Sequence, residues 1–276
     1  MNGPRLHRLF DPVSERCLDV AVDHGFFNEP GFLQGIAHMP SVIASLVEAA
    51  PDAIQLSPGQ ARLLQSMPVR PRPALVLRTD IANVYGSDVP DRPFSELIED
   101  AVGQAVRLDA ACVVVNLLDI DGRPELHRAC VRNVMALRAA CDLAAMPLMV
   151  EPLVMRPDGG AYTGVRDVDR IKALARQAVE LGADVVKADP SDPADRYGDV
   201  IEACAPIPVL VRGGGKVDSA ELFRRTAAVL EQGAAGIVYG RNIVQHPKPA
   251  VITQALMGIL HRGWTPEEAV EHLDAA

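Results

Sequence analysis

The stretch VRDVDRIKALARQAVELGADVVKAD, residues 165–189, holds one copy of the pattern that decides the fold. Apolar residues recur at steps of three and four over 165–182, which predicts an amphipathic helix, and Gly182 is a suitable C-cap. The apolar run at 184–189 follows at once and predicts a buried parallel strand. The stretch therefore reads as a helix followed by a strand, which is the repeating unit of an α/β fold.

The same alternation extends along the whole chain. Apolar runs that predict eight strands lie at 17–23, 53–56, 74–80, 112–118, 147–153, 184–189, 208–214 and 236–242. Helical patterns include 95–108, 165–182 and 219–233, and a last helix at about 265–275 is expected after Thr265. We expect one (β/α)8 TIM barrel domain over residues 1–276. A doubly wound sheet is the alternative, but it would need fewer strands or a reversal of strand order.

Composition excludes several classes of protein. The 276 residues are 49% apolar and 23% charged, which is typical of a globular enzyme. The net charge of −9 and the absence of a basic stripe argue against a nucleic-acid partner. Five cysteines without a CxxC pair predict neither a metal cluster nor a disulfide framework, and they favour the reducing cytoplasm. No secretory signal and no membrane span are expected.

One lysine stands inside an apolar strand. Lys187 is one of only four lysines, and it lies near the end of its run, where barrel enzymes place functional groups. A desolvated amine near another cation loses its proton more readily, and the neutral amine can attack a carbonyl carbon. Arg212, at the end of the next strand, is the candidate cation. The alternative is a lysine that is salt-bridged to a carboxylate or extends out of the strand end.

Other polar residues follow the strand ends. Asp23 is expected to act as a base or to bind substrate hydroxyls, or only to cap a turn. His24 is either catalytic or packed, and Glu151 either carries a proton or pairs with a cation. We expect Arg78 to pair with a carboxylate, of the protein or of the substrate, and Asn116 to lie in the same substrate-binding group.

Glycines end the last two strands. Gly213, Gly214 and Gly215 follow one of them, and Gly240 and Arg241 follow the other. Glycine lets the backbone approach an anion closely, and barrels often bind phosphate at this place. Tight turns are the alternative. The long loop at 25–40 carries three aromatic residues and is either a lid, a subunit contact or a surface-packed loop.

Several of these segments resemble a known family. The motifs DHGFF, VVKADPSD, LVRGGGK and GAAGIVYGRNIVQHPKPA are similar to those of the archaeal-type class I aldolases. That family includes fructose-bisphosphate aldolases, an aldolase that begins an alternative aromatic-precursor pathway, and the autoinducer-2-processing thiolase. The overall length and spacing look closest to the thiolase-like branch.

The resemblance implies a Schiff base on Lys187, an acid/base or orienting role for Asp23, and phosphate bound around Gly214, Gly215, Gly240 and Arg241. It also implies chemistry without a metal or other cofactor, and a large homo-oligomer such as a decamer. One departure stands out, because the fructose-bisphosphate aldolases carry a tyrosine as proton donor where this chain has Leu153.

The function expected from the sequence is therefore a class I aldolase that acts on a phosphorylated keto sugar or keto acid. One alternative is thiolase-like acyl transfer from a phosphorylated diketone to coenzyme A as a co-substrate. Others are a sugar-phosphate isomerase that forms no covalent adduct, and a sugar-phosphate binding protein without turnover.

Overall fold

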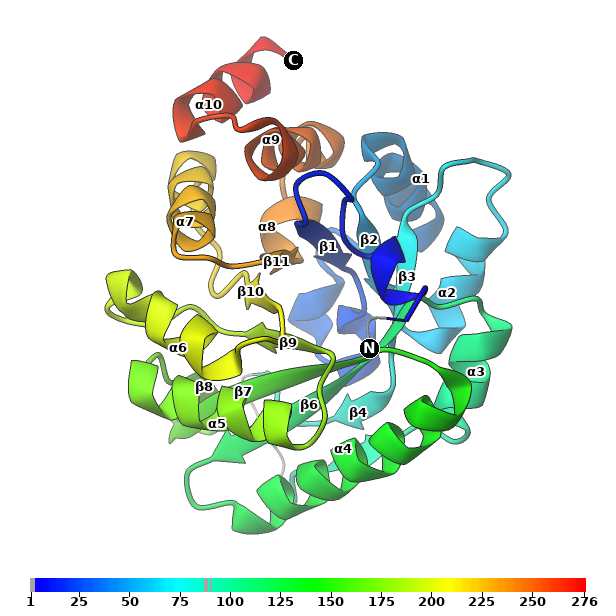
Figure 1. Cartoon of the computed structure of the whole chain (residues 1–276), viewed down its shortest axis with the longest axis vertical. Helices are drawn as coiled ribbons and strands as arrows, with labels where there is room; N and C mark the ends of the chain where they lie inside the picture. Colours follow the sequence, from blue (N-terminus) through cyan, green and yellow to red (C-terminus); the bar gives the residue numbers. More distant parts are fainter. Residues whose placement is uncertain (1–2, 87–88, 90) are drawn as a thin grey trace.

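The computed structural model describes residues 3–86, 89 and 91–276, and it shows a closed barrel of parallel strands surrounded by helices (Figure 1). The barrel strands are β1 (Cys17–Ala21), β2 (Ala53–Leu56), β3 (Ala74–Arg78), β6 (Cys112–Ile120), β7 (Leu148–Asp158), β9 (Val185–Ala188), β10 (Val209–Arg212) and β11 (Gly236–Tyr239). They neighbour one another in the order β6, β3, β2, β1, β11, β10, β9, β7, and pairing of β6 with β7 closes the ring. The predicted (β/α)8 barrel is confirmed.

Helices connect the strands and cover the outside of the barrel. The α-helices are α1 (Met39–Ala49), α2 (Pro58–Gln65), α3 (Ala101–Arg107), α4 (Pro124–Ala144), α5 (Val168–Glu180), α6 (Tyr197–Cys204), α7 (Ser219–Glu231), α8 (Arg241–Val244), α9 (Pro249–Arg262) and α10 (Pro266–Ala275). The short 3-10 helices are η1 (Leu6–Arg8), η2 (His24–Phe27), η3 (Pro30–Leu33) and η4 (Ala194–Arg196). The last helix begins at Pro266 with a capping box between Thr265 and Glu268, as the sequence predicts.

Side chains alternate between the two faces of each strand, so two cores form. The larger core lies between the strands and the helices, and the smaller one fills the barrel interior. On β1, Cys17 and Ala21 belong to the interior cluster, with Asp19 between them in the alternation. Leu6 of η1 and Leu9 belong to the same cluster and therefore close the amino-terminal end of the barrel.

The segment predicted as a helix over 95–108 is partly wrong. Residues Ser95–Leu97 form strand β5, which pairs antiparallel with β4 (Asp80–Ala82), and the helix begins only at Ala101. Asp100 has a left-handed backbone with φ 49°, which separates the strand from the helix. Pairing with β4 thus overrides the helical periodicity of the first residues.

Three further differences concern the ends of strands. β1 ends before Asp23, which precedes η2, and β11 ends before α8 begins at Arg241. β7 is longer than predicted and forms a hairpin with β8 (Ala161–Gly164) beyond the barrel. Among the described residues, no helix has the length and apolar character needed to cross a bilayer.

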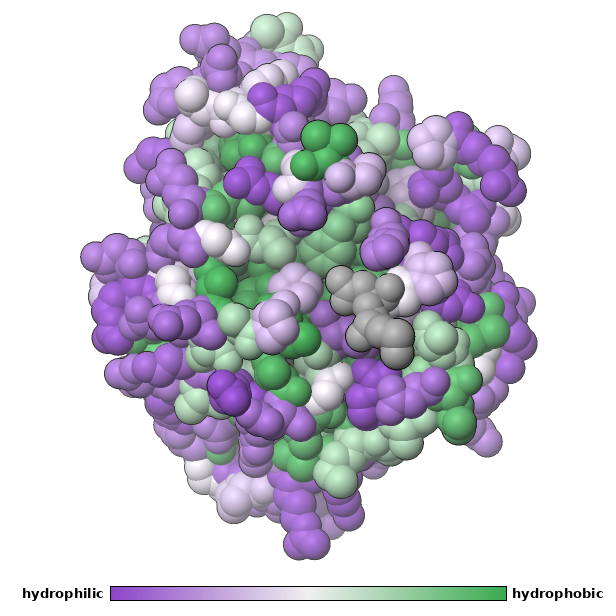
Figure 2. All heavy atoms as spheres, in the orientation of Figure 1, coloured by the Kyte–Doolittle hydropathy of each residue, from purple (hydrophilic) through white to green (hydrophobic). Residues whose placement is uncertain are grey.

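The face of the molecule in Figure 2 carries mostly hydrophilic residues around its rim. Hydrophobic residues are visible nearer to its middle. The polar side chains that are described next lie at the carboxyl ends of the barrel strands.

Candidate active site

A cavity opens at the carboxyl ends of the strands, where the sequence places the functional groups. Ten of the twelve predicted site residues line it: Asp23, His24, Arg78, Glu151, Lys187, Arg212, Gly213, Gly214, Gly240 and Arg241. Asn116 and Gly215 are absent from the lining. Ten residues from separate loops and strands thus share one cavity because barrel closure brings all eight strand ends together.

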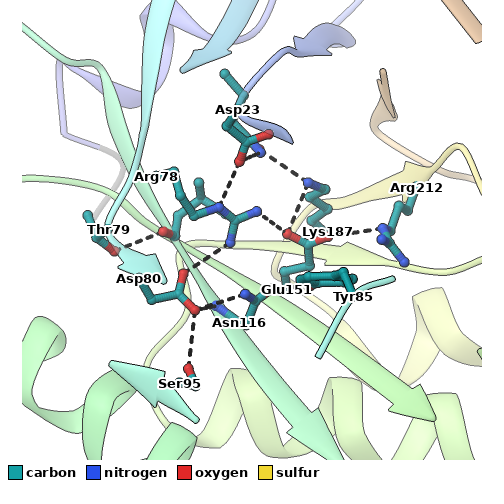
Figure 3. Close-up of polar contacts among 12 residues, drawn as sticks. Asp23, Arg78, Thr79, Asp80, Tyr85, Ser95, Asn116, Glu151, Lys187 and Arg212 are labelled. Atoms are coloured by element: carbon teal, nitrogen blue, oxygen red, sulfur yellow. Dashed lines mark hydrogen bonds and ion pairs between the residues drawn. The ribbon is translucent and has the colours of Figure 1, made fainter. Parts of the chain in front are cut away.

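Lys187 lies on β9, and only 3% of its surface is exposed. Its Nζ lies 3.0 Å from Glu151 Oε2 and donates a hydrogen bond to Gln55 Oε1 at 3.2 Å (Figure 3). The lysine therefore stays inside the barrel and does not extend to solvent. The salt bridge to a carboxylate, which the sequence offers as one alternative for Lys187, is present with Glu151. Lys187 also lines the cavity.

Glu151 of β7 joins three cations. Besides Lys187, its carboxylate accepts a hydrogen bond from Arg78 and pairs with Arg212 Nε at 3.0 Å. Burial opposes ionisation of this carboxyl, but the charges of Lys187, Arg78 and Arg212 outweigh burial and hold its pKa below the usual range. Glu151 is thus a fixed negative charge beside the amine.

Arg78 of β3 is 2% exposed and is held by three carboxylates. Its Nε donates to Asp23 at 2.8 Å, its Nη1 donates to Asp80 at 3.2 Å, and its Nη2 donates to Glu151. Of the two kinds of partner that the sequence allows, the structure shows the protein's own carboxylates. Arg78 therefore orients the carboxylates of the cavity.

Asp23 does not cap the turn that follows it, because its side chain makes no capping hydrogen bond to η2. Its Oδ2 accepts from Arg78 and, at 2.7 Å, from Gln55. Burial opposes ionisation, but the charges of Arg78 and Lys187 are stronger and lower the pKa of Asp23. The side chain lies at the cavity wall as an ionised carboxylate, in a position to accept a proton.

His24 packs edge-on against Phe32, with ring centroids 5.7 Å apart. Its Nδ1 is buried and has no hydrogen-bond partner among the described residues. Burial is the main cause that lowers its pKa to about 4, so the ring is neutral at pH 7. His24 is thus packed and also lines the cavity, and its catalytic role stays a prediction.

The glycines differ in what they permit. Gly214 has a φ of +59°, a conformation that residues with a side chain rarely adopt. A Cβ on Gly240 would lie 2.4 Å from His24 Cε1 and 2.7 Å from the Ala21 carbonyl oxygen, so only glycine fits there. Neither Gly214 nor Gly215 donates its N–H to a described protein group. The turn after β10 therefore has amides available to an anion.

Arg241 differs from the other cations of the cavity. Arg212 pairs with Glu151 and with Asp189 at 3.0 Å, whereas Arg241 has no ion pair among the described residues. Its guanidinium lies 5.5 Å from the centre of the Phe32 ring. Burial and the charge of Arg212 both lower its pKa. Arg241 is therefore a cation whose charge can be neutralised by a ligand.

Two members of the site were not singled out from the sequence. Gln55 on β2 links Asp23 to Lys187. Its signal was a polar residue inside the apolar run AIQL, which is the same signal that marks Lys187. Tyr85 lines the cavity from the loop after β4, and no local pattern marks it.

Tyr85 is positioned by neighbours from two elements. Its hydroxyl donates to Asn116 Oδ1 at 3.2 Å, and its ring lies 4.6 Å from that of Phe27. Asn116 in turn donates to Asp80 at 2.8 Å, so it supports Tyr85 from outside the cavity lining (Figure 3). Burial and the charge of Glu151 raise the pKa of Tyr85, which keeps the hydroxyl protonated.

The loop at 25–40 turns two of its aromatic rings toward the cavity. Phe27 and Phe32 both line it, from η2 and from the η3 segment. Phe32 also contacts Tyr85, with ring centroids 6.0 Å apart. The loop is thus part of the cavity wall, which a surface-packed loop would not be.

Comparisons with known proteins agree with this geometry. Residues 17–246 match the DeoC/LacD family aldolase description. An uncharacterized aldolase of Saccharolobus solfataricus is 32% identical over 98% of this chain and 97% of its own length. The 3-hydroxy-5-phosphonooxypentane-2,4-dione thiolase of Salmonella typhimurium is 29% identical over 97% of this chain and 84% of its own.

A solved structure of a Schiff-base-forming fructose-1,6-bisphosphate aldolase shares the fold. It superposes with a TM-score of 0.75 at 22% identity, over 93% of this chain and 98% of that one. The match to the family description covers all eight barrel strands and every residue of the candidate site. The chain therefore belongs to the DeoC/LacD aldolase family.

Proposed function

We propose that this protein is a class I aldolase that forms a Schiff base between Lys187 and a phosphorylated keto substrate. The observation that carries the proposal is the Lys187 amine, which is buried, lies at the carboxyl end of a barrel strand and faces a cavity. Its contacts with Glu151 and Gln55 orient the amine, and Lys187 still lines the cavity. Such a desolvated amine is a nucleophile once it loses a proton.

The phosphate is proposed to bind at the ends of β10 and β11, the two strands that follow the strand of the lysine around the barrel. Gly214, Gly240 and Arg241 line that part of the cavity, and Arg241 has no carboxylate partner among the described residues. Backbone amides and a guanidinium together form a strong site for a phosphate group. Bound there, the phosphate holds the carbonyl carbon near Lys187, so the reaction gains mainly from orientation.

The chemistry follows from the protonation states. Lys187 attacks the carbonyl, water leaves, and the iminium forms with Glu151 as its fixed counter-ion. Asp23 is held ionised and accepts the proton of the β-hydroxyl, so that the bond between the α and β carbons breaks and its electrons enter an enamine. The Tyr85 hydroxyl, which stays protonated, then donates a proton to the enamine carbon and regains the proton that Asp23 accepted, and water hydrolyses the resulting iminium to release the product and the Lys187 amine.

Borohydride reduction followed by peptide mass spectrometry tests the proposal. We expect a stable adduct on Lys187 with one member of a panel of phosphorylated ketoses and dihydroxyacetone phosphate. Lys187→Met should form none, while Lys172→Met, at an exposed lysine paired with Asp169, should behave as the wild type. Wild-type protein that binds a sugar phosphate by calorimetry and yet forms no adduct would contradict the proposal.

The thiolase-like reaction is the second candidate, favoured by the 29% identity to a thiolase over almost the whole chain. In that reaction the Lys187 intermediate would be resolved by acyl transfer to the thiol of coenzyme A. Product analysis with and without coenzyme A separates the two. An acyl-thioester that appears only with coenzyme A supports transfer, whereas an aldehyde product without it supports aldol cleavage.

The homo-oligomer expected from the resemblance stays a prediction. Light scattering coupled to size-exclusion chromatography measures the mass directly. A mass near ten times that of one chain would agree with a decamer, and a monomeric mass would contradict it.

A further inference from the structure

Gln55 is a fully buried amide that lies between the two reacting groups and has no role in the steps above. It stands on β2 two residues after Ala53, which belongs to the interior cluster, so Gln55 also points into the barrel. Four steps separate β2 from β9 in the ring of strands, so the side chain of Gln55 reaches across the barrel to Lys187. A buried amide is costly unless both of its ends are bonded.

The neighbours of Gln55 fix which end of the amide faces which group. Asp23 Oδ2 already accepts a hydrogen bond from Arg78 Nε at 2.8 Å, so the Gln55 atom 2.7 Å from Oδ2 is the donating Nε2. The carbonyl Oε1 then faces Lys187 Nζ at 3.2 Å and accepts from it. The backbone is held as well, because the Val22 N–H donates to the Gln55 carbonyl at 2.9 Å. The amide therefore cannot turn over without losing both side-chain bonds.

One consequence concerns the base. Gln55 and Arg78 both donate to the same oxygen of Asp23, Oδ2. No described residue donates a hydrogen bond to Oδ1, and this atom is not sealed off from the cavity that Asp23 lines. Two donors on one oxygen fix the direction of the other, so Oδ1 is the oxygen that can accept a proton from a substrate hydroxyl.

The other consequence concerns the nucleophile. A neutral amine has two N–H groups and one lone pair. Glu151 Oε2 lies 3.0 Å from Lys187 Nζ and Gln55 Oε1 lies 3.2 Å from it, so each oxygen can accept from one N–H. The lone pair then takes the remaining position, and Lys187 lines the cavity that a carbonyl carbon would enter. With Glu151 as the only acceptor, the lone pair could take either of two positions.

We propose that Gln55 is a positioning residue of the aldolase reaction, which directs the Lys187 lone pair and the Asp23 Oδ1 atom toward the same substrate. This inference rests on the proposed Schiff-base function. Gln55 does not line the cavity, so it acts through Lys187 and Asp23. Because the amide is neutral, it links the nucleophile to the base without adding a charge to the ion network.

The contact with Lys187 serves the addition step. The lone pair forms the carbon–nitrogen bond, the carbonyl π electrons move to oxygen, and one proton passes from nitrogen to that oxygen, which gives a neutral carbinolamine. Its hydroxide leaves and becomes water with one proton from solvent, and an iminium with a single N–H remains. That N–H stays with Glu151, because an ionised acceptor forms the stronger hydrogen bond. Gln55 should therefore speed imine formation and leave the final yield of imine unchanged.

The rate at which borohydride traps Lys187 tests this role. Enzyme is mixed with dihydroxyacetone phosphate over a range of concentrations, reduced at intervals and analysed by peptide mass spectrometry. In Gln55→Met, which keeps the length of the side chain without the amide, the maximal rate should fall about 10-fold or more. The concentration that gives half of this rate should stay at the wild-type value, since the proposed phosphate site does not include Gln55. A wild-type maximal rate in Gln55→Met would overturn the inference.

Gln65→Met is the matched control. Gln65 ends α2, and its amide also donates to a carbonyl oxygen of the protein, that of Leu108, but it does not line the cavity. Its replacement should leave the rate of adduct formation unchanged. If Gln65→Met slows the rate as much as Gln55→Met does, loss of any amide hydrogen bond has this effect, and the inference is wrong.

Gln55→Glu separates orientation from packing and does not depend on how well Gln55→Met folds. A protonated carboxyl donates through its O–H and accepts through its C=O, so it replaces both bonds of the amide. An ionised carboxyl cannot donate to Asp23 and repels it. The charged groups at this place are Asp23 and Lys187, with Arg78 and Glu151 bonded to them, so the two neighbouring carboxyls titrate as a pair.

The variants should therefore differ in their response to pH. We expect the rate of Gln55→Glu to approach that of the wild type at the same pH as the pH falls from 8 to 5. Gln55→Met should keep one ratio to the wild type throughout, because methionine does not titrate. A ratio for Gln55→Glu that does not change with pH would overturn the inference, since a residue that only fills space would respond in this way.

The two proposals fail differently. Absence of an adduct in the wild type, with dihydroxyacetone phosphate and with every phosphorylated ketose of the panel, contradicts the Schiff base and also removes the reaction that Gln55 would orient. An adduct that forms equally fast in the wild type and in Gln55→Met keeps the Schiff base and removes Gln55 from its mechanism.

Discussion

The two ends of the barrel are built from the same eight strands and differ in what fills them. At the carboxyl end, Arg78, Glu151, Lys187 and Arg212 are buried or half-buried together, and Asp23, Asp80 and Asp189 provide further counter-charges. At the amino end, Leu6 and Leu9 close an interior that consists of apolar side chains. The side chains that fill this interior include Cys17, Ala53, Ala74, Cys112, Met149, Val185 and Leu210.

This difference separates stability from chemistry. An apolar interior gains free energy from burial, whereas a buried ion network roughly balances its desolvation cost against its mutual attraction. The amino end can therefore stabilise the barrel, and the carboxyl end can hold charges whose arrangement serves a reaction. Asp19 lies at the boundary, as a titratable group that faces the apolar interior.

The largest expected effect comes from breaking the ion network at its centre. Glu151→Gln leaves Lys187, Arg78 and Arg212 without a shared counter-ion, so the free energy of unfolding should fall by about 3–5 kcal/mol. Turnover should fall at least about 10²-fold, because the iminium loses its counter-charge. Urea unfolding and steady-state kinetics measure the two effects.

Glu180→Gln is the control for that substitution, since Glu180 pairs with Arg176 on the exposed face of α5. It should change stability by less than about 1 kcal/mol. Equal losses in both variants would show that the buried network has no special importance.

Removing the charge at the boundary should stabilise the protein instead. The pKa of Asp19 is raised from the usual 3.8 to about 7 by burial, so its contribution to stability is complete below pH 3.8 and is lost as pH rises through 7. That step corresponds to about 4 kcal/mol, and Asp19→Asn should recover up to this amount at pH 8 and almost none at pH 4.

Urea unfolding of Asp19→Asn at the two pH values measures this gain. Asp274→Asn, at an exposed aspartate of α10, should show no pH-dependent gain. A stability difference from the wild type that is the same at pH 4 and pH 8 would disagree with the raised pKa.

A change within the cavity that spares the ion network should affect only the chemistry. Tyr85→Phe removes the proposed proton donor, and we expect turnover to fall about 10²-fold while the Lys187 adduct still forms. Tyr162→Phe is the matched control. Tyr162 lies on β8 of the hairpin, its hydroxyl accepts a hydrogen bond from Arg123, and it does not line the cavity. Normal turnover in Tyr85→Phe would exclude Tyr85 as the donor.

The smallest expected effect lies at the amino end. His261 bridges Ser14 at 2.7 Å and Asp52 at 3.0 Å, and it ties α9 to the segments before β1 and β2. His261→Ala should lower the free energy of unfolding by about 1–3 kcal/mol and leave turnover unchanged.

Thermal or urea unfolding beside an adduct assay checks the His261 prediction, with His7→Ala as an exposed control. Loss of activity in His261→Ala, at a temperature where the variant is folded, would mean that the two ends are not independent.

How far the sequence predicts the site depends on where the signal lies. Lys187, Glu151 and Arg212 follow from polar residues near the ends of apolar runs, and Gln55 carries the same signal and could have been found. Tyr85 could not, because it lies in a loop whose path depends on the pairing of β4 with β5. The same pairing explains why the helix predicted from residue 95 begins only at Ala101.

The sequence by itself determined the barrel and the end at which its polar groups gather. Both follow from local patterns, since periodicity sets the type of each element and a parallel strand has one carboxyl end. Only the tertiary structure decided which charged and polar side chains pair with one another. The triple pairing of Glu151, the link through Gln55 and the isolation of Asp19 depend on closure of β6 on β7, which brings distant segments within hydrogen-bonding distance.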